Sequence, residues 1–148
     1  MWAGVKPERA AGADFREVKI PQINDNQVLI KTIASSICGT DKHIYNWDKW
    51  AQGRLKPPLI FGHECCGDVV EVGKNIRGLK LGDFVAAESH IPCGVCKQCR
   101  MGNMHICDNL VILGVDTDGI FAEYVSLPEI VCWKIDKHMD PAIASIHE

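Results

Sequence analysis

The sequence predicts a mainly β, barrel-like domain with short helices, and three observations lead to that class. Short apolar or alternating segments recur along the chain, glycine-containing turns separate many of them, and little of the sequence shows a helical period. The 148 residues are enough for one domain with a hydrophobic core. No repeat, low-complexity tract or linker divides the chain.

The strands are predicted from runs of apolar residues and from two-residue alternation. Residues 15–20 alternate as a half-buried strand does, and residues 27–34 contain the stronger run Val28-Leu29-Ile30. Pro57-Pro58 favours extended backbone just before residues 59–61. The predicted strands cover residues 1–5, 15–20, 27–34, 59–61, 67–73, 82–85, 120–127 and 131–135.

Helices are predicted at only two places. Thr40 is a favourable N-cap for a short helix that follows a strand ending at Cys38, and Asp140 followed by Pro141 marks the start of another helix. Residues 47–58 are predicted to form a loop. Because the last helix would still continue at Glu148, we expect the chain to be part of a longer protein.

Charge and hydropathy exclude two classes of function. The 16 Lys and Arg residues against 19 Asp and Glu residues give a net charge of −3, which disfavours a nucleic-acid-binding surface. No apolar segment approaches the ~20 residues of a membrane helix, and the N-terminus has no signal-peptide pattern. We therefore expect a cytoplasmic protein with no membrane or nucleic-acid partner.

Four of the eight cysteines form one tight series. Cys93, Cys96 and Cys99 are spaced three residues apart, and Cys107 follows eight residues later. Four soft thiolates can close a tetrahedron around Zn²⁺ and leave no open position, so this centre is predicted to be structural. The polar residues between the cysteines cannot form a core, so metal binding would supply folding energy to a lobe at about residues 90–110.

Two alternatives to structural zinc exist for this series. Two disulfides, or four unrelated thiols, would suit a small secreted protein, but no secretory signal accompanies the cysteines. An iron–sulfur cluster is disfavoured because the bacterial ferredoxin pattern places its fourth cysteine much sooner, followed by proline.

A second candidate metal centre combines Cys38 with His63. Residues 37–46 place a thiol, the Thr40 hydroxyl and the His43 imidazole within one short turn, and three helical positions bring His43 over the same face. Cys38, His63 and a carboxylate or water would give a mixed ligand shell with an exchangeable position, as in catalytic zinc sites. The alternative is a histidine satisfied by hydrogen bonds beside a buried thiol. The remaining cysteines are interpreted as core residues: Cys65, Cys66 and Cys132.

Three sets of residues together resemble the zinc-dependent medium-chain alcohol dehydrogenase family. They are Gly62-His63-Glu64-x-x-Gly67-x5-Gly73-x-x-Ile76, the segment Cys38-Gly39-Thr40-Asp41, and the four-cysteine series. The resemblance covers essentially the whole chain, residues 1–148, and implies the GroES-like β-barrel catalytic domain of that family. Residues 43–48 and 88–93 further resemble the family members that oxidise L-threonine.

The resemblance implies a chemistry for the second metal centre. Zinc held by Cys38, His63 and Glu64 would act as a Lewis acid on the 3-hydroxyl of L-threonine, and water could stand in for Glu64 in that shell. Hydride would pass to NAD, which gives 2-amino-3-oxobutanoate. Full-length members would carry two zinc ions per subunit and assemble as homotetramers.

The resemblance also implies roles for four residues outside the zinc shell. The released proton would pass through Thr40 to His43, whose ordinary pKa of ~6.5 suits a relay at neutral pH. Glu148 would take part in the proton relay, and His90 would line the substrate pocket.

The chain has no Gly-x-Gly-x-x-Gly after a predicted strand, so the family's NAD-binding Rossmann domain is missing from these residues. We expect this chain by itself to bind zinc but to perform no turnover. The alternatives are a related polyol or alcohol dehydrogenase, of the sorbitol or butanediol type, and a non-catalytic zinc-stabilised β-barrel used for binding.

Overall fold

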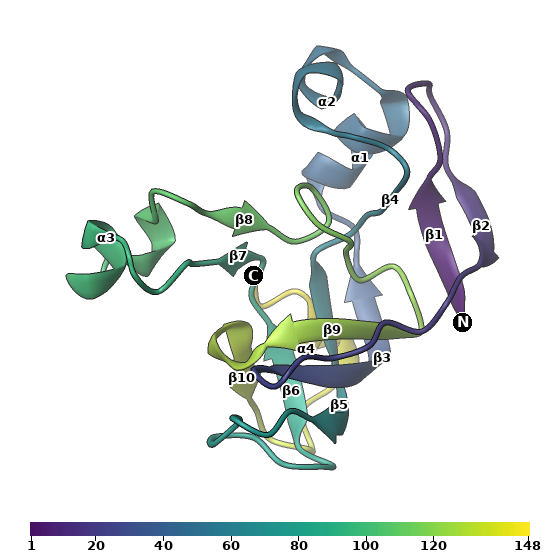
Figure 1. The fold of residues 1–148 in the computed structure, drawn as a ribbon. Helices are drawn as coiled ribbons and strands as arrows, with labels where there is room; N and C mark the ends of the chain where they lie inside the picture. Colours follow the sequence, from purple (N-terminus) through teal and green to yellow (C-terminus); the bar gives the residue numbers. More distant parts are fainter.

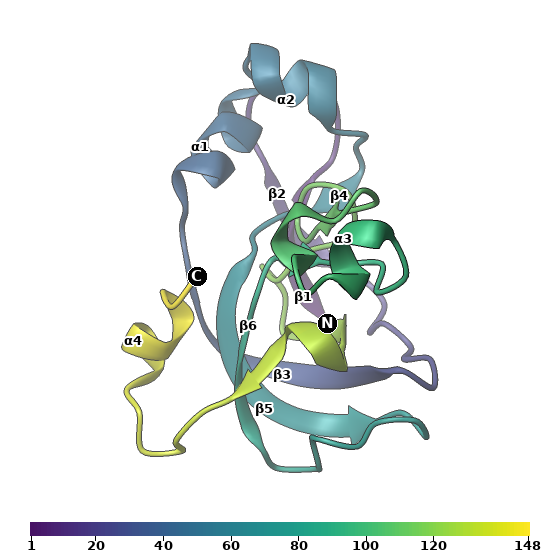
Figure 2. The same cartoon turned by 90° about the vertical axis from the view of Figure 1, so that its left-hand side faces the viewer.

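A curled, five-stranded antiparallel sheet is the largest unit of the computed structural model, which describes residues 1–148 (Figures 1 and 2). Every neighbouring pair in this sheet is antiparallel. The strands lie in the order β10 (Cys132–Lys134), β6 (Phe84–Ala87), β5 (Glu64–Val72), β3 (Gln27–Ser36) and β9 (Tyr124–Pro128). The predicted mainly β class is confirmed.

The main hydrophobic core lies against this sheet. Val28 and Ile30 of β3 and Leu127 of β9 are fully buried, since alternate residues of each strand point to the same face. Cys65 and Cys66 are also fully buried and Cys132 nearly so, which confirms their interpretation as core residues. Burial raises the pKa of the Cys65 thiol and raises that of Cys132 to about 12, so neither is a ready thiolate.

A second sheet and two helices form the other end of the molecule (Figure 1). The sheet has the order β2 (Asp14–Glu17), β1 (Trp2–Lys6) and β4 (Leu59–Ile60). Above it lie α1 (Gly39–Asn46) and α2 (Lys49–Arg54). Ile44 of α1 and Ala51 of α2 pack into a small core of their own with Leu55, Leu59, Phe61 and Val115.

The predicted loop at residues 47–58 is wrong, because α2 lies within it. Asp48 is the N-cap of α2, and its Oδ1 accepts a hydrogen bond of 3.0 Å from the Ala51 amide. The prediction of Thr40 as an N-cap is also wrong. Strand β3 ends at Ser36, and Cys38 is the N-cap of α1.

Two further strand predictions need shorter bounds. The predicted strand at 15–20 is β2, which ends at Glu17. The strand predicted at 120–127 begins only at Tyr124, because the amides of Ile120 and Phe121 donate instead to the carbonyls of Gly62 and Phe61, each at 3.0 Å.

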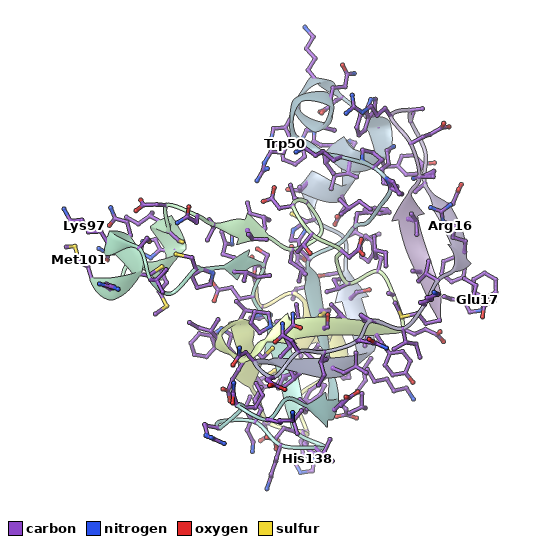
Figure 3. The ribbon with its side chains drawn as sticks, viewed as in Figure 1. Arg16, Glu17, Trp50, Lys97, Met101 and His138 are labelled. Atoms are coloured by element: carbon purple, nitrogen blue, oxygen red, sulfur yellow. The ribbon has the colours of Figure 1, made fainter.

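The four-cysteine segment forms a lobe that projects from the body (Figures 1 and 3). A short ribbon of β7 (His90–Ile91) and β8 (Val111–Ile112) joins the lobe to the body, and the side chains of Lys97 and Met101 point away from the molecule (Figure 3). The lobe contains α3 (Lys97–Arg100) and the 3₁₀ helix η1 (Met104–Ile106).

The last helix, α4 (Pro141–Ser145), packs against β3 and β5. Asp140 is its N-cap, as predicted, and its Oδ1 accepts a hydrogen bond of 2.9 Å from the Ala142 amide. The helix ends at Ser145, so the prediction that it continues through Glu148 is wrong. A second 3₁₀ helix, η2 (Glu129–Val131), precedes β10. None of these helices has the length and apolar character needed to cross a membrane.

Candidate metal centres

The four cysteines of the lobe converge on one point. The Sγ atoms of Cys93, Cys96, Cys99 and Cys107 all lie within 4.8 Å of one another. Adjacent sulfurs around a tetrahedral zinc with bonds of ~2.3 Å are about 3.8 Å apart, and the Cys96 and Cys107 sulfurs are separated by 3.8 Å. All eight cysteines are free thiols, so the disulfide alternative fails. The four thiols fit one tetrahedral ion.

Backbone amides prepare two of these thiols to bind a cation. Hydrogen bonds from the Val95 and Cys96 amides lower the pKa of Cys93 to about 6, and the Cys99 amide lowers the pKa of Cys96. Burial has the opposite effect on Cys99, whose pKa it raises to about 12. A bound cation would offset that cost, because it favours the thiolate.

The second centre brings together Cys38, His63 and Glu64. Their candidate ligand atoms also lie within 4.8 Å of one another. Cys38 lies at the junction of β3 and α1, and the other two residues lie where the chain enters β5. The His63 Nε2 is 4.0 Å from the Glu64 Oε1. This mixed set of sulfur, nitrogen and oxygen is typical of zinc centres that keep an exchangeable position.

Asp41 is hydrogen-bonded to one ligand of this centre and faces another. Its Oδ2 accepts a hydrogen bond of 2.9 Å from the Cys38 amide, and its Oδ1 lies 3.8 Å from the His63 Nδ1. Both the Oδ1 and the Nδ1 atoms are buried without a hydrogen-bond partner. Burial raises the pKa of Asp41, partly opposed by the bond from the Cys38 amide. Metal bound at Nε2 would make Nδ1 the protonated nitrogen and direct it at this carboxylate.

A cavity of about 310 Å³ opens beside the second centre. Thr40, His90 and Glu148, three of the predicted site residues, lie on its wall with the three candidate ligands. The rest of the wall combines polar and apolar side chains that the sequence did not single out as site residues: Trp50, Ser89, Ile112 and Val115. A larger apolar cavity of about 740 Å³ lies elsewhere and contains none of the candidate metal ligands.

Glu148 is held on the cavity wall by Ser89. The Ser89 amide donates a hydrogen bond of 2.8 Å to the Glu148 Oε2, and the Ser89 hydroxyl donates to Oε1. The His90 Nδ1 lies 2.9 Å from the Ser89 Oγ and 3.4 Å from the Glu148 Oε1. Ser89 was missed in the sequence, although its position beside His90 is a signal that could have found it.

His43 is not brought into this cavity. Its side chain is 58% exposed, and its Nδ1 lies 2.5 Å from the Asp48 Oδ2. The Thr40 hydroxyl, in contrast, lies 3.8 Å from the Cys38 Sγ. The Asp48 carboxylate, at the N-cap of α2, therefore holds the His43 imidazole by a hydrogen bond, and His43 is not among the residues of the cavity wall.

Comparison with known proteins places this geometry in a family. Residues 24–137 match the model of the alcohol dehydrogenase GroES-like domain.

The chain belongs to that family.

Curated relatives of this GroES-like domain share about half of its residues. L-threonine 3-dehydrogenase of Bacillus velezensis is 55% identical over 148 residues, and that of Caldanaerobacter subterraneus is 54% identical. All of the chain is covered in both cases, but only 43% of each relative. The chain therefore spans less than half the length of the curated relatives it matches.

Solved structures of dehydrogenases have the same fold as this GroES-like domain. Galactitol-1-phosphate dehydrogenase from Escherichia coli has a TM-score of 0.88 at 27% sequence identity. The match covers 98% of this chain and 41% of the dehydrogenase chain. A structure from Sinorhizobium meliloti 1021, described as a zinc-binding dehydrogenase bound to NADP, has a TM-score of 0.86 at 34% identity. That match covers 97% of this chain and 41% of the Sinorhizobium meliloti chain.

Proposed function

We propose that this chain carries both metal centres of an NAD-dependent zinc dehydrogenase that oxidises the 3-hydroxyl of L-threonine to 2-amino-3-oxobutanoate. The observation that carries the proposal is the convergence of Cys38, His63 and Glu64 on a cavity that also contains Glu148. The identity of about 50% to proteins named L-threonine 3-dehydrogenase supports the substrate.

Zinc at Cys38, His63 and Glu64 would supply Lewis-acid polarisation of the substrate hydroxyl. The chain's own residues would then orient the substrate and handle its proton. Thr40, on the cavity wall beside Cys38, would accept the hydroxyl proton and give up its own. Glu148, held by its hydrogen bonds from Ser89, would serve the same relay as a carboxylate on the cavity wall. The proton given up by Thr40 would pass onward to His43, and His90 would contact the substrate.

The apolar part of the cavity suits the methyl end of a small substrate. Ile112 and Val115 provide aliphatic surface, whereas Ser89, His90 and Glu148 provide polar groups for an amino acid head. NAD would be bound by residues of the longer protein outside this chain, since these 148 residues have no glycine fingerprint. We place the assembled protein in the cytoplasm as a homotetramer.

Metal analysis and kinetics test the proposal together. Native mass spectrometry of the purified chain is expected to show two zinc ions, and the Cys38→Ser variant to show one. The longer protein should reduce NAD with L-threonine far better than with sorbitol, butanediol or simple alcohols. A protein with an empty Cys38 centre, or with sorbitol as its best substrate, would contradict the proposal.

The chain by itself is expected to form no NADH from L-threonine and NAD. The measurement is absorbance at the nicotinamide band with zinc-loaded chain in excess. Turnover by these 148 residues alone would show that the hydride acceptor binds within them, against the proposal.

A further inference from the structure

Lys6 is a fully buried lysine without an ion-pair partner. Its side chain, at the end of β1, has 0% of its surface exposed, and no carboxylate lies within ion-pair distance. Burial lowers the pKa of Lys6, and the negative charge of Glu8 partly opposes that shift. A buried ammonium group without a counter-charge is costly, so a fold that keeps one must satisfy all of its donors.

Three backbone carbonyls satisfy the Lys6 ammonium group. Its Nζ donates to Gly12 at 2.7 Å, to Tyr45 at 3.2 Å and also to Ala10. The ring of Trp47 lies 5.3 Å from the same nitrogen and adds a cation–π contact. These partners come from two places, since Ala10 and Gly12 belong to the β1–β2 turn and Tyr45 to the last turn of α1.

The contact therefore fixes the C-terminal end of α1. The Gly12 amide donates to the Tyr45 carbonyl at 2.8 Å, so that carbonyl receives both donors. A cation is favourable at this end of a helix, where the carbonyls point outward and the dipole is negative. Trp47 ends the helix with a left-handed backbone, φ 54°, which its packing against Lys6 helps to hold.

The N-terminal end of the same helix forms part of the second metal centre. α1 has only eight residues and is about 12 Å long. Cys38 is its N-cap, and Asp41 in its first turn contacts both Cys38 and His63. A short, hydrogen-bonded helix moves as one body, so displacement of its C-terminal end displaces Cys38 and Asp41 as well.

We propose that Lys6 is a positioning residue for the Cys38–His63–Glu64 centre: it anchors the far end of α1 and thereby fixes the Cys38 thiol and the Asp41 carboxylate. This inference rests on the proposed function only in that the centre binds zinc. The ligands of the lobe centre all lie between residues 93 and 107, outside α1, so that centre serves as an internal reference.

The direct test is the Lys6→Met variant, which keeps the length of the side chain and removes the charge and donors. Cobalt(II) binding distinguishes the two centres by absorption, because one offers four thiolates and the other a single thiolate. Affinity at the Cys38 centre should fall by about 10- to 100-fold, as for other residues that orient metal ligands. Affinity at the lobe should not change.

Two matched variants separate positioning from general destabilisation. Leu127→Ala removes a fully buried side chain from the main core, away from α1, and should lower the unfolding temperature without a selective loss at the Cys38 centre. Lys42→Met removes an exposed charge from α1 itself and should leave both affinities unchanged. Equal weakening at both centres in Lys6→Met, or unchanged affinity at the Cys38 centre, overturns the proposal.

A reciprocal measurement needs no variant, so it holds even if Lys6→Met does not fold. Coupling is mutual, so metal at the Cys38 centre must stabilise the Lys6 contacts. Hydrogen exchange of the Gly12 amide should therefore slow when zinc fills that centre after the lobe is already loaded. No change at Gly12 would refute the coupling. A wild-type centre that takes up no zinc would instead refute the proposed function.

Discussion

The carboxylate of Asp41 contacts two ligands of the second centre without being a predicted ligand itself. It accepts a hydrogen bond from the Cys38 amide, and its Oδ1 lies 3.8 Å from the His63 Nδ1. The sequence showed Asp41 only as part of a short motif, since no spacing rule reveals which side chain lies behind a histidine. Ligands can be predicted from residue type and spacing, but the groups that orient them depend on the folded backbone.

Replacing Asp41 by asparagine tests this arrangement. The amide preserves the shape of the side chain but removes the charge that faces His63, so zinc at the Cys38 centre should bind about 10- to 100-fold more weakly. Dialysis against graded chelator, followed by metal analysis, measures the loss. The lobe zinc is the control, and retention of both ions at wild-type affinity would contradict the prediction.

Asp83 leads to a prediction about the stability of the fold at acidic pH. It is buried, its Oδ1 lies 2.8 Å from the Lys134 Nζ, and the hydrogen bond from Lys134 lowers its pKa below 3.8. Because the folded pKa is the lower one, this pair contributes stability at pH values above about 4, and the contribution is lost as the pH falls through the folded pKa. The Lys134→Met variant should therefore lose less stability between pH 6 and pH 3 than wild type.

Urea midpoints at the two pH values measure that difference. Neither Asp83 nor Lys134 is a candidate metal ligand, so acid should release zinc equally from both proteins, and comparison of the two pH dependences isolates the contribution of the pair. An equally steep fall in the variant would show that the Asp83–Lys134 contact has no part in acid stability.

At the scale of elements, the close backbone contact between Gly62 and Gly119 fixes the turn that precedes His63. Gly62 has φ +86°, and a Cβ on Gly119 would lie 2.1 Å from the Gly62 carbonyl oxygen. The segment before β9 can pack against this turn only because a side chain is missing there. The approach of residues 60–62 to residues 119–121 thus places the histidine at the entrance to β5.

The Gly119→Ala variant should disturb both fold and metal. The added methyl group must push the Gly62 backbone away, so we expect a destabilisation of about 1–3 kcal/mol and weaker zinc binding at the Cys38 centre. Gly53→Ala is the matched control: it lies in α2 with no atom within 4 Å of the new methyl, and alanine favours a helix. Thermal unfolding with metal analysis checks both, and a neutral Gly119→Ala would contradict the prediction.

The elements also show where prediction from the sequence ends. Apolar runs and alternation located the central strands, because an antiparallel sheet with one buried face requires that pattern. Helix α2 has no comparable signal, since its six residues include Gly53 and depend on the Asp48 cap and on burial of Ala51. The same Asp48 holds the His43 imidazole by a hydrogen bond, so one unrecognised cap accounts for the missed helix and for the exposed position of His43.

At the scale of the whole molecule, we expect the lobe to depend on a bound metal ion. Between residues 93 and 107 only Cys99 and Cys107 are buried, and the segment projects from the body (Figure 1). It has no apolar core to keep it folded without the ion. The five-stranded sheet, in contrast, has a core of twelve buried residues that needs no metal.

Removal of zinc from the lobe should therefore unfold the lobe alone. Limited proteolysis after chelation is expected to cut within residues 93–107 first, while amides of β3 and β5 keep their protection from hydrogen exchange. The Cys99→Ser variant should behave likewise with zinc present. Simultaneous loss of protection across the sheet would contradict separate stabilities.

The chain distances spanned by the two centres set the order in which they can form during refolding. The lobe gathers its four sulfurs from 15 consecutive positions, counted from Cys93 to Cys107, and closing so short a loop takes well under a microsecond. The other centre must join Cys38 to His63 across α1, α2 and β4, and its ligands come together only when β3, which precedes Cys38, has paired with β5, which follows His63. A nascent chain supplied with limiting zinc would therefore fill the lobe centre first and the Cys38 centre last.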